Sequence, residues 1–185
     1  MKQTLHLFAK AILLLVLINT STASAQNYNF TTWNTGNNSV LTVSAFRSVT
    51  IDKRGNAWVG ADLGGLYNFN TKDSIWKKAN TYLDVTFRHL VPSNIVADSN
   101  VWATSIGKSA VQAITGGAYH INTKTEVITQ YGSGIAGGLS SRYANSLALS
   151  KSGKVYVASA QMLTGTTTFQ GGVYVSSTLN PPPPS

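Results

Sequence analysis

The chain offers few side chains for acid–base chemistry, because it contains only six carboxylates in 185 residues. They are Asp52, Asp62, Asp73, Asp84, Asp98 and Glu126. Asp52 and Asp98 fall in expected hairpin turns, where an aspartate usually caps the turn. Asp62 and Asp84 fall in expected loops and form the one plausible acid–base pair. A glycosidase or lyase needs more converging groups than these two, so we expect no catalysis.

Three arginines occupy similar positions in the successive repeats. Arg47, Arg88 and Arg142 each lie at or just before the first expected strand of a repeat. Arg88 and Arg142 stand 14 residues ahead of the aromatic residue in the following strand, and Arg47 stands 11 ahead. Guanidinium groups bind carboxylate or sulfate through paired hydrogen bonds. We therefore hypothesise a site for an acidic sugar or similar anion. In the alternative interpretation, each arginine pairs with loop carbonyls or faces water.

Other loop residues would supply stacking or amide contacts to such a ligand, and they are weaker candidates than the arginines. They are Tyr82, Gln112, Tyr143, Gln161 and Met162. Long loops on a rigid scaffold are where binding residues concentrate. The long connections expected at 81–87, 105–115, 132–142 and 159–170 all fall on one side of the repeats, so we place the site there. The other side carries only tight turns.

No cofactor or metal is expected. The chain has no cysteine, which excludes disulfides, thiol chemistry and cysteine-based zinc sites. His89 and His120 have no partner at metal-ligand spacing. The glycines at 132, 134 and 137 match a dinucleotide fingerprint by letters only, since no helix or acidic residue follows.

The N-terminus has the layout of a secretory signal peptide over residues 1–25. Lys2 and Lys10 flank the start of an apolar run, Ala11–Ile18, and Ala23-Ser24-Ala25 provides a cleavage site. An uncleaved anchor is the alternative, but the run is short for a bilayer, which needs roughly 20 residues. We expect a secreted, periplasmic or cell-surface bacterial protein with no membrane span after cleavage.

The mature chain would remain basic. The formal net charge is +8, and loss of Lys2 and Lys10 would leave +6. The basic residues are scattered, without a basic helix or cluster, so we expect no nucleic-acid binding.

Alternating apolar runs predict the strands. Four such runs lie within Phe46–Lys78, separated by Gly- and Asn-rich turns, and predict an antiparallel meander. They are Ser48–Asp52, Ala57–Ala61, Gly65–Phe69 and Ser74–Lys77.

This unit then recurs. Gly64-Gly65-Leu66-Tyr67 returns as Gly116-Gly117-Ala118-Tyr119 and as Gly171-Gly172-Val173-Tyr174, at intervals of 52 and 55 residues. A four-stranded unit repeating at about 40–50 residues is typical of propeller blades. The repeated Trp and Tyr residues are expected to pack between blades: Trp33, Trp58, Trp76, Trp102, Tyr67, Tyr119, Tyr156 and Tyr174. Trp33 is the candidate exception, because its partner blade is absent.

The fold class predicted is all-β, a partial β-propeller of about three four-stranded antiparallel blades. The expected segments are a signal peptide (1–25), an orphan outer strand and lead-in (26–44), blade 1 (45–80), blade 2 (81–131), an incomplete blade 3 (132–178) and a Pro-rich tail (179–185). The orphan strand is expected at Phe30–Asn34. Either the chain is the N-terminal part of a longer ring, or it is an open arc that stands alone or pairs with a second chain. Expected partners are therefore missing blades or a second chain.

The motif Asp52-x-x-Gly55-Asn56-x-Trp58-Val59-Gly60 followed by Gly64-Gly65-Leu66-Tyr67 resembles the two-component regulator propeller repeat. That repeat builds extracytoplasmic sensor domains of hybrid histidine kinases and related secreted proteins, largely in Bacteroidetes. The second repeat shortens the turn to Asp98-Ser99-Asn100. The third has Ser150 for the Asp and Tyr156 for the Trp. The pattern is also near those of sialidase-like and streptogramin-lyase-like propellers.

The resemblance implies a propeller that binds or senses glycans or related molecules. We therefore expect an exported, non-enzymatic binding module for a carbohydrate or other extracellular ligand. Two alternatives stay open: a fragment of a propeller lyase or glycosidase, and a structural or adhesion repeat without a small-molecule site.

Overall fold

The computed structural model describes residues 30–79, 85–93, 100–107, 116–132, 138–141, 143–164, 167–169 and 171–177. The chain divides into two compact units, Met1–Thr32 and Trp33–Ser185. In the first unit only residues 30–32 are described, and they contain no strand. The expected signal peptide therefore lies outside the described residues, as does the expected Pro-rich tail. All the described strands belong to the second unit.

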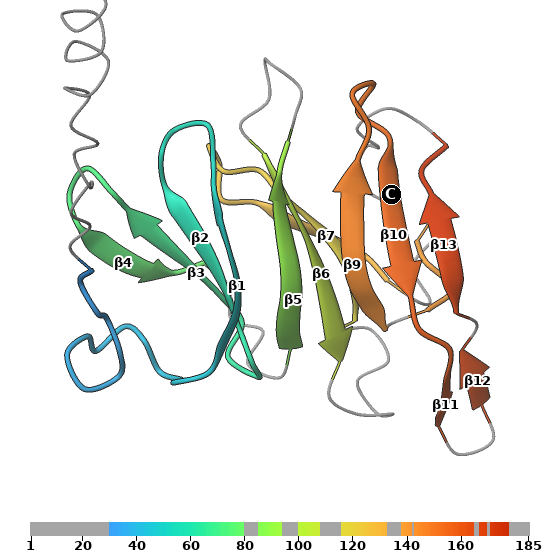
Figure 1. Ribbon diagram of the computed structural model, residues 1–185, viewed down its shortest axis with the longest axis horizontal. Helices are drawn as coiled ribbons and strands as arrows, with labels where there is room; N and C mark the ends of the chain where they lie inside the picture. Colours follow the sequence, from blue (N-terminus) through green and yellow to red (C-terminus); the bar gives the residue numbers. More distant parts are fainter. Residues whose placement is uncertain are drawn as a thin grey trace, which may run out of the picture. The chain divides into compact units, whose positions relative to one another are not determined.

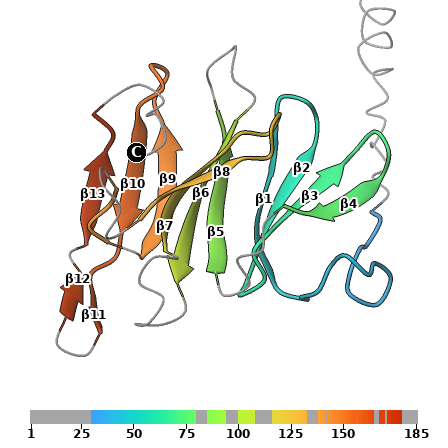
Figure 2. The same cartoon turned by 180° about the vertical axis from the view of Figure 1, so that it is seen from behind.

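The described part of this unit is all β and its strands pair antiparallel (Figures 1 and 2). Sheet 1 contains β1 (Phe46–Ile51), β2 (Ala57–Ala61), β3 (Leu66–Asn70) and β4 (Ile75–Lys78) in chain order. Sheet 2 contains β5 (Val85–Pro92), β6 (Val101–Gly107), β7 (Gly117–Ile121) and β8 (Ile128–Tyr131), also in chain order. Sheet 3 contains β9 (Ala144–Leu149), β10 (Val155–Ser159) and β13 (Gly172–Val175), with β10 in the middle.

The β1–β2 turn shows why the first repeat has its motif. One oxygen of Asp52, Oδ1, accepts hydrogen bonds from the backbone amides of Arg54 and Asn56, each at 2.9 Å. The other, Oδ2, accepts the indole N–H of Trp58 at 2.9 Å. Gly55 has a φ of 84°, which glycine adopts without strain. Asp52 therefore closes the turn and fixes the Trp58 ring, which is buried.

The β9–β10 turn of sheet 3 resembles the β1–β2 turn, but the aromatic residue that follows it is not buried. Ser150 Oγ accepts the backbone amide of Lys154 at 2.9 Å, and Gly153 has the same φ of 84°. Tyr156 stands where the tryptophan would be, and it is 38% exposed. The expectation that every repeated aromatic packs between blades is therefore wrong for Tyr156. Within the described residues, no further sheet lies against its face of sheet 3.

Two apolar clusters join the sheets. The first packs Trp58 and Leu66 of sheet 1 against residues of sheet 2, which are Val85, Phe87, Leu90, Val101, Ala103, Tyr119 and Ile121. The second packs Trp102, Ala118 and Tyr131 of sheet 2 against Ala144, Leu147, Val155 and Val157 of sheet 3. The same face of each sheet thus packs on the next sheet along the chain.

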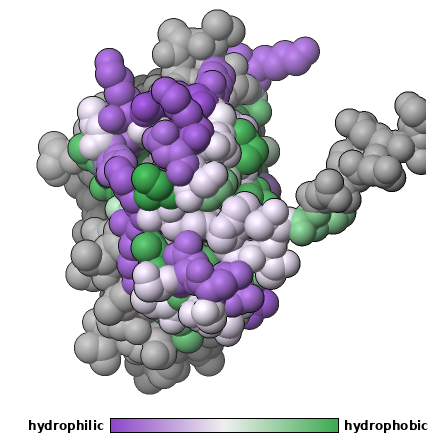
Figure 3. Space-filling model, turned by 90° about the vertical axis from the view of Figure 1, so that its left-hand side faces the viewer, coloured by the Kyte–Doolittle hydropathy of each residue, from purple (hydrophilic) through white to green (hydrophobic). Residues whose placement is uncertain are grey.

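The segment before β1 forms no strand between residues 30 and 45, so the expected outer strand at Phe30–Asn34 is absent. An edge strand needs a neighbour, and no described strand pairs with this segment. Instead, Leu41 is buried against Val59 and Tyr67 of sheet 1. The Trp33 ring lies 4.9 Å from that of Phe69. Figure 3 views the molecule from this side and shows apolar residues scattered among polar ones.

The connection between β10 and β13 also differs from expectation. Residues 159–170 were expected to form a long irregular loop. They include a β-hairpin of β11 (Met162–Thr164) and β12 (Thr167–Phe169), which forms a separate two-stranded sheet. Threonine-rich runs favour strands, and this segment carries several threonines. In the described residues, no fourth strand joins sheet 3.

Candidate functional site

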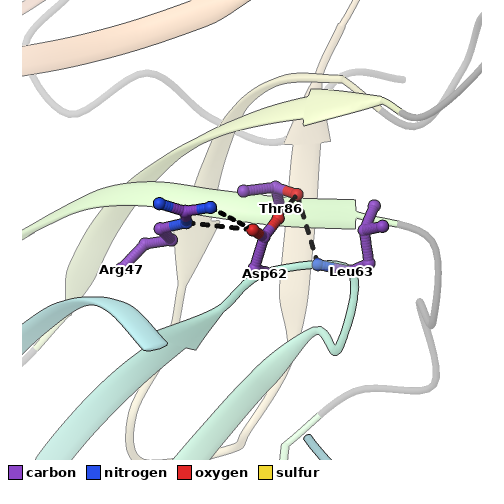
Figure 4. A network of polar contacts seen from close by, with 4 residues as sticks. All are labelled: Arg47, Asp62, Leu63 and Thr86. Carbon is purple, nitrogen blue, oxygen red and sulfur yellow. Dashed lines mark hydrogen bonds and ion pairs between the residues drawn. The ribbon is translucent and has the colours of Figure 1, made fainter. Parts of the chain in front are cut away.

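A polar network lies where sheet 1 meets sheet 2 (Figure 4). The Arg47 guanidinium forms an ion pair with Asp62 through Nη2, and its Nε donates to the same carboxylate oxygen at 3.1 Å. The Thr86 hydroxyl donates to the other oxygen of Asp62 at 2.7 Å. That hydroxyl accepts the backbone amide of Leu63 at 3.2 Å. The network therefore links β1, the β2–β3 connection and β5.

Backbone contacts hold the β2–β3 connection in place. The amide of Asp62 donates to the Ala45 carbonyl at 2.8 Å, and that of Gly65 donates to Val85 of β5 at 3.4 Å. Leu63 has a φ of 52°, which is uncommon for a residue with a side chain. A Cβ at Gly64 would lie 2.5 Å from the Val43 side chain. Asp62 is thus positioned by a tightly packed connection.

The charges near Asp62 lower its pKa. The hydrogen bond from Arg47 is the largest cause, followed by that from Thr86, and the positive charge of Arg88 adds to them. Hydrogen bonds and nearby cations favour the ionised carboxylate. Asp62 therefore stays charged and engaged at neutral pH, which suits an orienting group better than a general acid or base.

β-bulges place Arg47 and Arg88, the two of the three candidate arginines that the structure describes. Arg47 lies between the paired residues Phe46 and Ser48 of β1, and Arg88 lies between Phe87 and His89 of β5. In β9 the corresponding bulge residue is Asn145, between Ala144 and Ser146. All three side chains are exposed. Bulges re-aim side chains and are frequent beside functional sites. We call Arg47, Arg88 and Asn145 the bulge row.

Sequence reasoning missed Asn145 because it relied on spacing across a turn of variable length. The β5–β6 turn closes between Ser93 and Asn100, and the β1–β2 turn closes between Asp52 and Asn56. The longer turn moves Arg88 from 11 to 14 residues ahead of its aromatic, the same distance as Arg142. Asn145 stands 11 ahead of Tyr156, as Arg47 stands ahead of Trp58. This equal spacing of 11 residues is the feature of the sequence that could have identified Asn145.

The remaining candidates divide into three groups. Asp84, Arg142, Tyr82 and Gln112 lie outside the described residues. Tyr143 is buried, and its carbonyl accepts the Ser159 hydroxyl at 2.9 Å and the Ala160 amide at 3.0 Å. Gln161 is exposed, and Met162 begins β11. The structure thus brings Arg47, Asp62 and Arg88 together. Tyr143 has a structural role instead, because its side chain is buried and its carbonyl accepts two hydrogen bonds.

The histidine of β5 has a structural role. His89 Nδ1 accepts the backbone amide of Leu147 at 3.2 Å and lies 3.2 Å from the Ser146 hydroxyl, so it links sheet 2 to sheet 3. Within the described ranges, no three His, Cys, Asp or Glu residues gather as metal ligands would. A search of the same residues finds no helix with the length and apolarity needed to cross a membrane.

No family model and no curated protein matches the chain. Among solved structures, the extracellular domain of a hybrid two component system from B. thetaiotaomicron is similar. Its TM-score is 0.50 and its identity 14%, over 80% of this chain and 19% of that one. The chain folds as a partial β-propeller. It spans about a fifth of the length of this structure, and the likeness concerns the fold alone.

Proposed function

We propose that this chain is an exported, non-catalytic propeller module that binds an extracellular carbohydrate bearing carboxylate or sulfate groups. The bulge row carries the proposal, because it presents two exposed arginines at equivalent positions of neighbouring first strands. The fold likeness to the extracellular domain of a hybrid two component system supports a sensing role.

Asp62 favours binding by holding Arg47 in one orientation. The Arg47 side chain remains 56% exposed although it is paired. A guanidinium has five N–H donors, and Asp62 engages only the Nε and Nη2 groups. A pre-oriented arginine loses less conformational entropy when it binds a ligand. Arg47 can therefore pair with Asp62 and still donate to an anion.

Arg88 adds a second positive charge to the site, close enough to Asp62 to lower the pKa of that carboxyl. Among the described residues, no carboxylate forms an ion pair with Arg88, whereas Asp62 neutralises Arg47. Two guanidinium groups around one carboxylate leave a net positive site, which attracts acidic sugars. The Asn145 amide in the next sheet both donates and accepts, as recognition of sugar hydroxyls requires.

The engagement of Asp62 supports binding over catalysis. Hydrolysis of a glycosidic bond commonly uses a carboxylic acid with a raised pKa as proton donor. The pKa of Asp62 is lowered, chiefly by the Arg47 hydrogen bond. Asp62 would thus make a poor proton donor at neutral pH.

Calorimetric titration with an oligogalacturonate and with a neutral oligosaccharide of equal length tests the proposal. We expect Arg88→Gln to weaken oligogalacturonate binding about tenfold or more, because a hydrogen bond to a charged group contributes about 1.5–3 kcal/mol. Lys124→Gln is the matched control, since Lys124 is exposed in the β7–β8 turn and its loss changes the net charge equally. Equal affinity of both variants, or equal binding of the neutral sugar, would overturn the proposal. Release of new reducing ends would overturn its non-catalytic part.

A further inference from the structure

A cavity of about 240 Å³ lies between sheet 2 and sheet 3, apart from the bulge row. Trp102, Ala118 and Tyr131 line it from sheet 2, and Val155, Val157 and Tyr174 line it from sheet 3. These six residues belong to the second apolar cluster or pack against it. The cavity is therefore an apolar hollow at the contact between the two sheets, and it is open to solvent on one side.

We call the contact of sheet 1 with sheet 2 the first junction and the contact of sheet 2 with sheet 3 the second junction. A comparison of their side chains explains why the second junction contains a cavity. Alignment of the repeats places Leu66 of sheet 1 at the position of Ala118, and both follow the second glycine of the repeat. On the facing sheet, Ile121 occupies the position of Ser176, which also lines the cavity. Leu66 and Ile121 are fully buried in the first cluster. Ile128 of β8 packs there too, and no described strand supplies its counterpart in sheet 3.

At the second junction, larger side chains elsewhere make up only part of this lost side-chain volume. Tyr131 occupies the position of Ala79, which packs against the first cluster, so a larger side chain replaces a smaller one there. Val157 likewise replaces the smaller Ala103, so the loss of side-chain volume lies at positions such as Ala118 and Ser176. Protein interiors are normally packed as densely as organic crystals, and the smaller side chains leave part of this sheet contact without such packing.

The walls favour an uncharged aromatic guest. None of the described residues around the cavity is Lys, Arg, Asp or Glu. The rings of Trp102 and Tyr131 lie 5.6 Å apart, and burial raises the pKa of the Tyr131 phenol, so this ring stays neutral. Tyr174 shares a hydrogen bond of 2.6 Å with Ser140, which fixes the third ring. Aromatic walls bind aromatic guests by stacked or edge-to-face contacts.

The volume limits the size of the guest. An apolar protein cavity of about 150 Å³ binds benzene, so about 240 Å³ accommodates a somewhat larger molecule. We propose that this cavity is a binding site for an uncharged aromatic molecule of one or two rings. The site is independent of the acidic carbohydrate proposed for the bulge row.

Titration of the full chain with indole, followed by amide and indole N–H resonances in two-dimensional NMR, tests this site. We expect indole to shift the resonances of Trp102, Val155 and Val157. Ala118→Leu restores the residue of the first junction and should weaken indole binding at least tenfold. Ala148→Leu is the matched control, because Ala148 is exposed and does not line the cavity. It should retain the affinity of the parent protein.

A second filling variant guards against a folding failure. Ser176→Ile places the isoleucine of the first junction at the other side of the cavity, and it should also weaken indole binding. Arg88→Gln should leave indole affinity unchanged, which separates this site from the bulge row. Indole that shifts no lining resonance, or that binds Ala118→Leu and Ser176→Ile as tightly as the parent protein, would overturn the proposal. Tighter binding of an indole carboxylate than of indole would overturn its charge preference.

Discussion

Arg47, Asp62 and Thr86 form a unit in which each group limits the freedom of the others. Asp62 receives hydrogen bonds on both oxygens, from β1 on one side and from β5 on the other. Its side chain is 27% exposed, so water reaches the pair and weakens its contribution. The network therefore orients the Arg47 side chain more than it stabilises the fold. Its small contribution to stability should be detected through its dependence on pH.

The variant Asp62→Asn should show this pH response. The pKa of Asp62 is lower in the folded protein than in the unfolded chain, where it is about 3.9. Its ionised form thus stabilises the fold above that pH, and this stabilisation disappears as the pH falls through the lower folded-state pKa. Urea unfolding at several pH values should show the parent protein more stable than the variant near neutrality. The gap should close in acid.

Salt provides the control, since screening should narrow the same gap at neutral pH. A gap of constant size down to the lowest pH at which the protein folds would contradict the assigned role of Asp62.

At the scale of single residues, the sequence predicted that some members of the candidate site lie near one another. Arg47, Arg88 and Asp62 were chosen because they flank first strands or follow second strands, and strand order alone brings such positions together. Asn145 could not be chosen by a spacing that crosses a turn, because the β5–β6 turn is longer than its counterparts. The packing of Tyr143 was also hidden, because exposure depends on neighbours from other sheets.

At the scale of elements, a single carboxylate anchors the β1–β2 hairpin. Asp52→Ala would remove two caps of backbone amides and leave the buried Trp58 indole N–H without an acceptor. Unsatisfied buried donors cost about 1–3 kcal/mol. We expect a loss of about 2–4 kcal/mol in the free energy of unfolding, measured with urea. Ser150→Ala, at the equivalent turn of sheet 3, should cost less than half as much.

A double-mutant cycle isolates the Asp52–Trp58 bond. Trp58→Phe removes the donor, so Asp52→Ala should cost less in that background than in the parent protein. Equal costs in both backgrounds would show that the bond contributes nothing beyond the turn.

Gly60 controls how closely sheet 1 approaches sheet 2. A Cβ at this position would lie 2.7 Å from Phe87 Cβ and 2.8 Å from the Phe87 carbonyl oxygen. Because the carbonyl belongs to the backbone of β5, relief requires movement of the sheet. We expect Gly60→Ala to lower stability by about 1–3 kcal/mol, a typical cost of overpacking, with a corresponding fall in the thermal midpoint. An unchanged thermal midpoint would mean that sheet 1 and sheet 2 can move apart at Gly60 without a measurable loss of stability.

The elements themselves were predicted better than their junctions. Alternation and turn residues placed the strands of sheet 1 within two residues of their observed bounds. The β11–β12 hairpin was missed because its strands are three residues long, too short to show an alternating apolar pattern. The segment over Phe30–Asn34 resembles a strand locally, but strand formation depends on a partner that its own sequence does not encode.

At the scale of the whole molecule, sheet 3 presents an uncovered apolar face. Val173 is 70% exposed and Val175 is 50% exposed. Their counterparts in sheet 1 include Leu66, which is fully buried against sheet 2. Tyr156 lies on the same face, opposite Val175 across β10 and β13. We propose that a further sheet, from additional blades or from a second chain, covers this face.

Solution mass measured across a range of concentrations tests the second-chain form of this proposal. We expect concentration-dependent association of the full chain, and we expect Val173→Lys to shift it towards monomer, because a lysine on this face would be desolvated without a partner. Val127→Lys is the matched control, since Val127 is exposed in the β7–β8 connection, away from this face. A parent protein that is monomeric at every concentration would rule out the second chain as the cover.

The bulges have an evolutionary consequence. Each displaces one residue out of the ladder, so its side chain faces solvent and takes no part in the apolar clusters. Mutation at Arg88 or Asn145 is therefore largely uncoupled from folding, whereas Arg47 also pairs with Asp62. For the carbohydrate site proposed above, Arg88 and Asn145 are therefore positions at which ligand preference can change while the apolar clusters beneath stay the same.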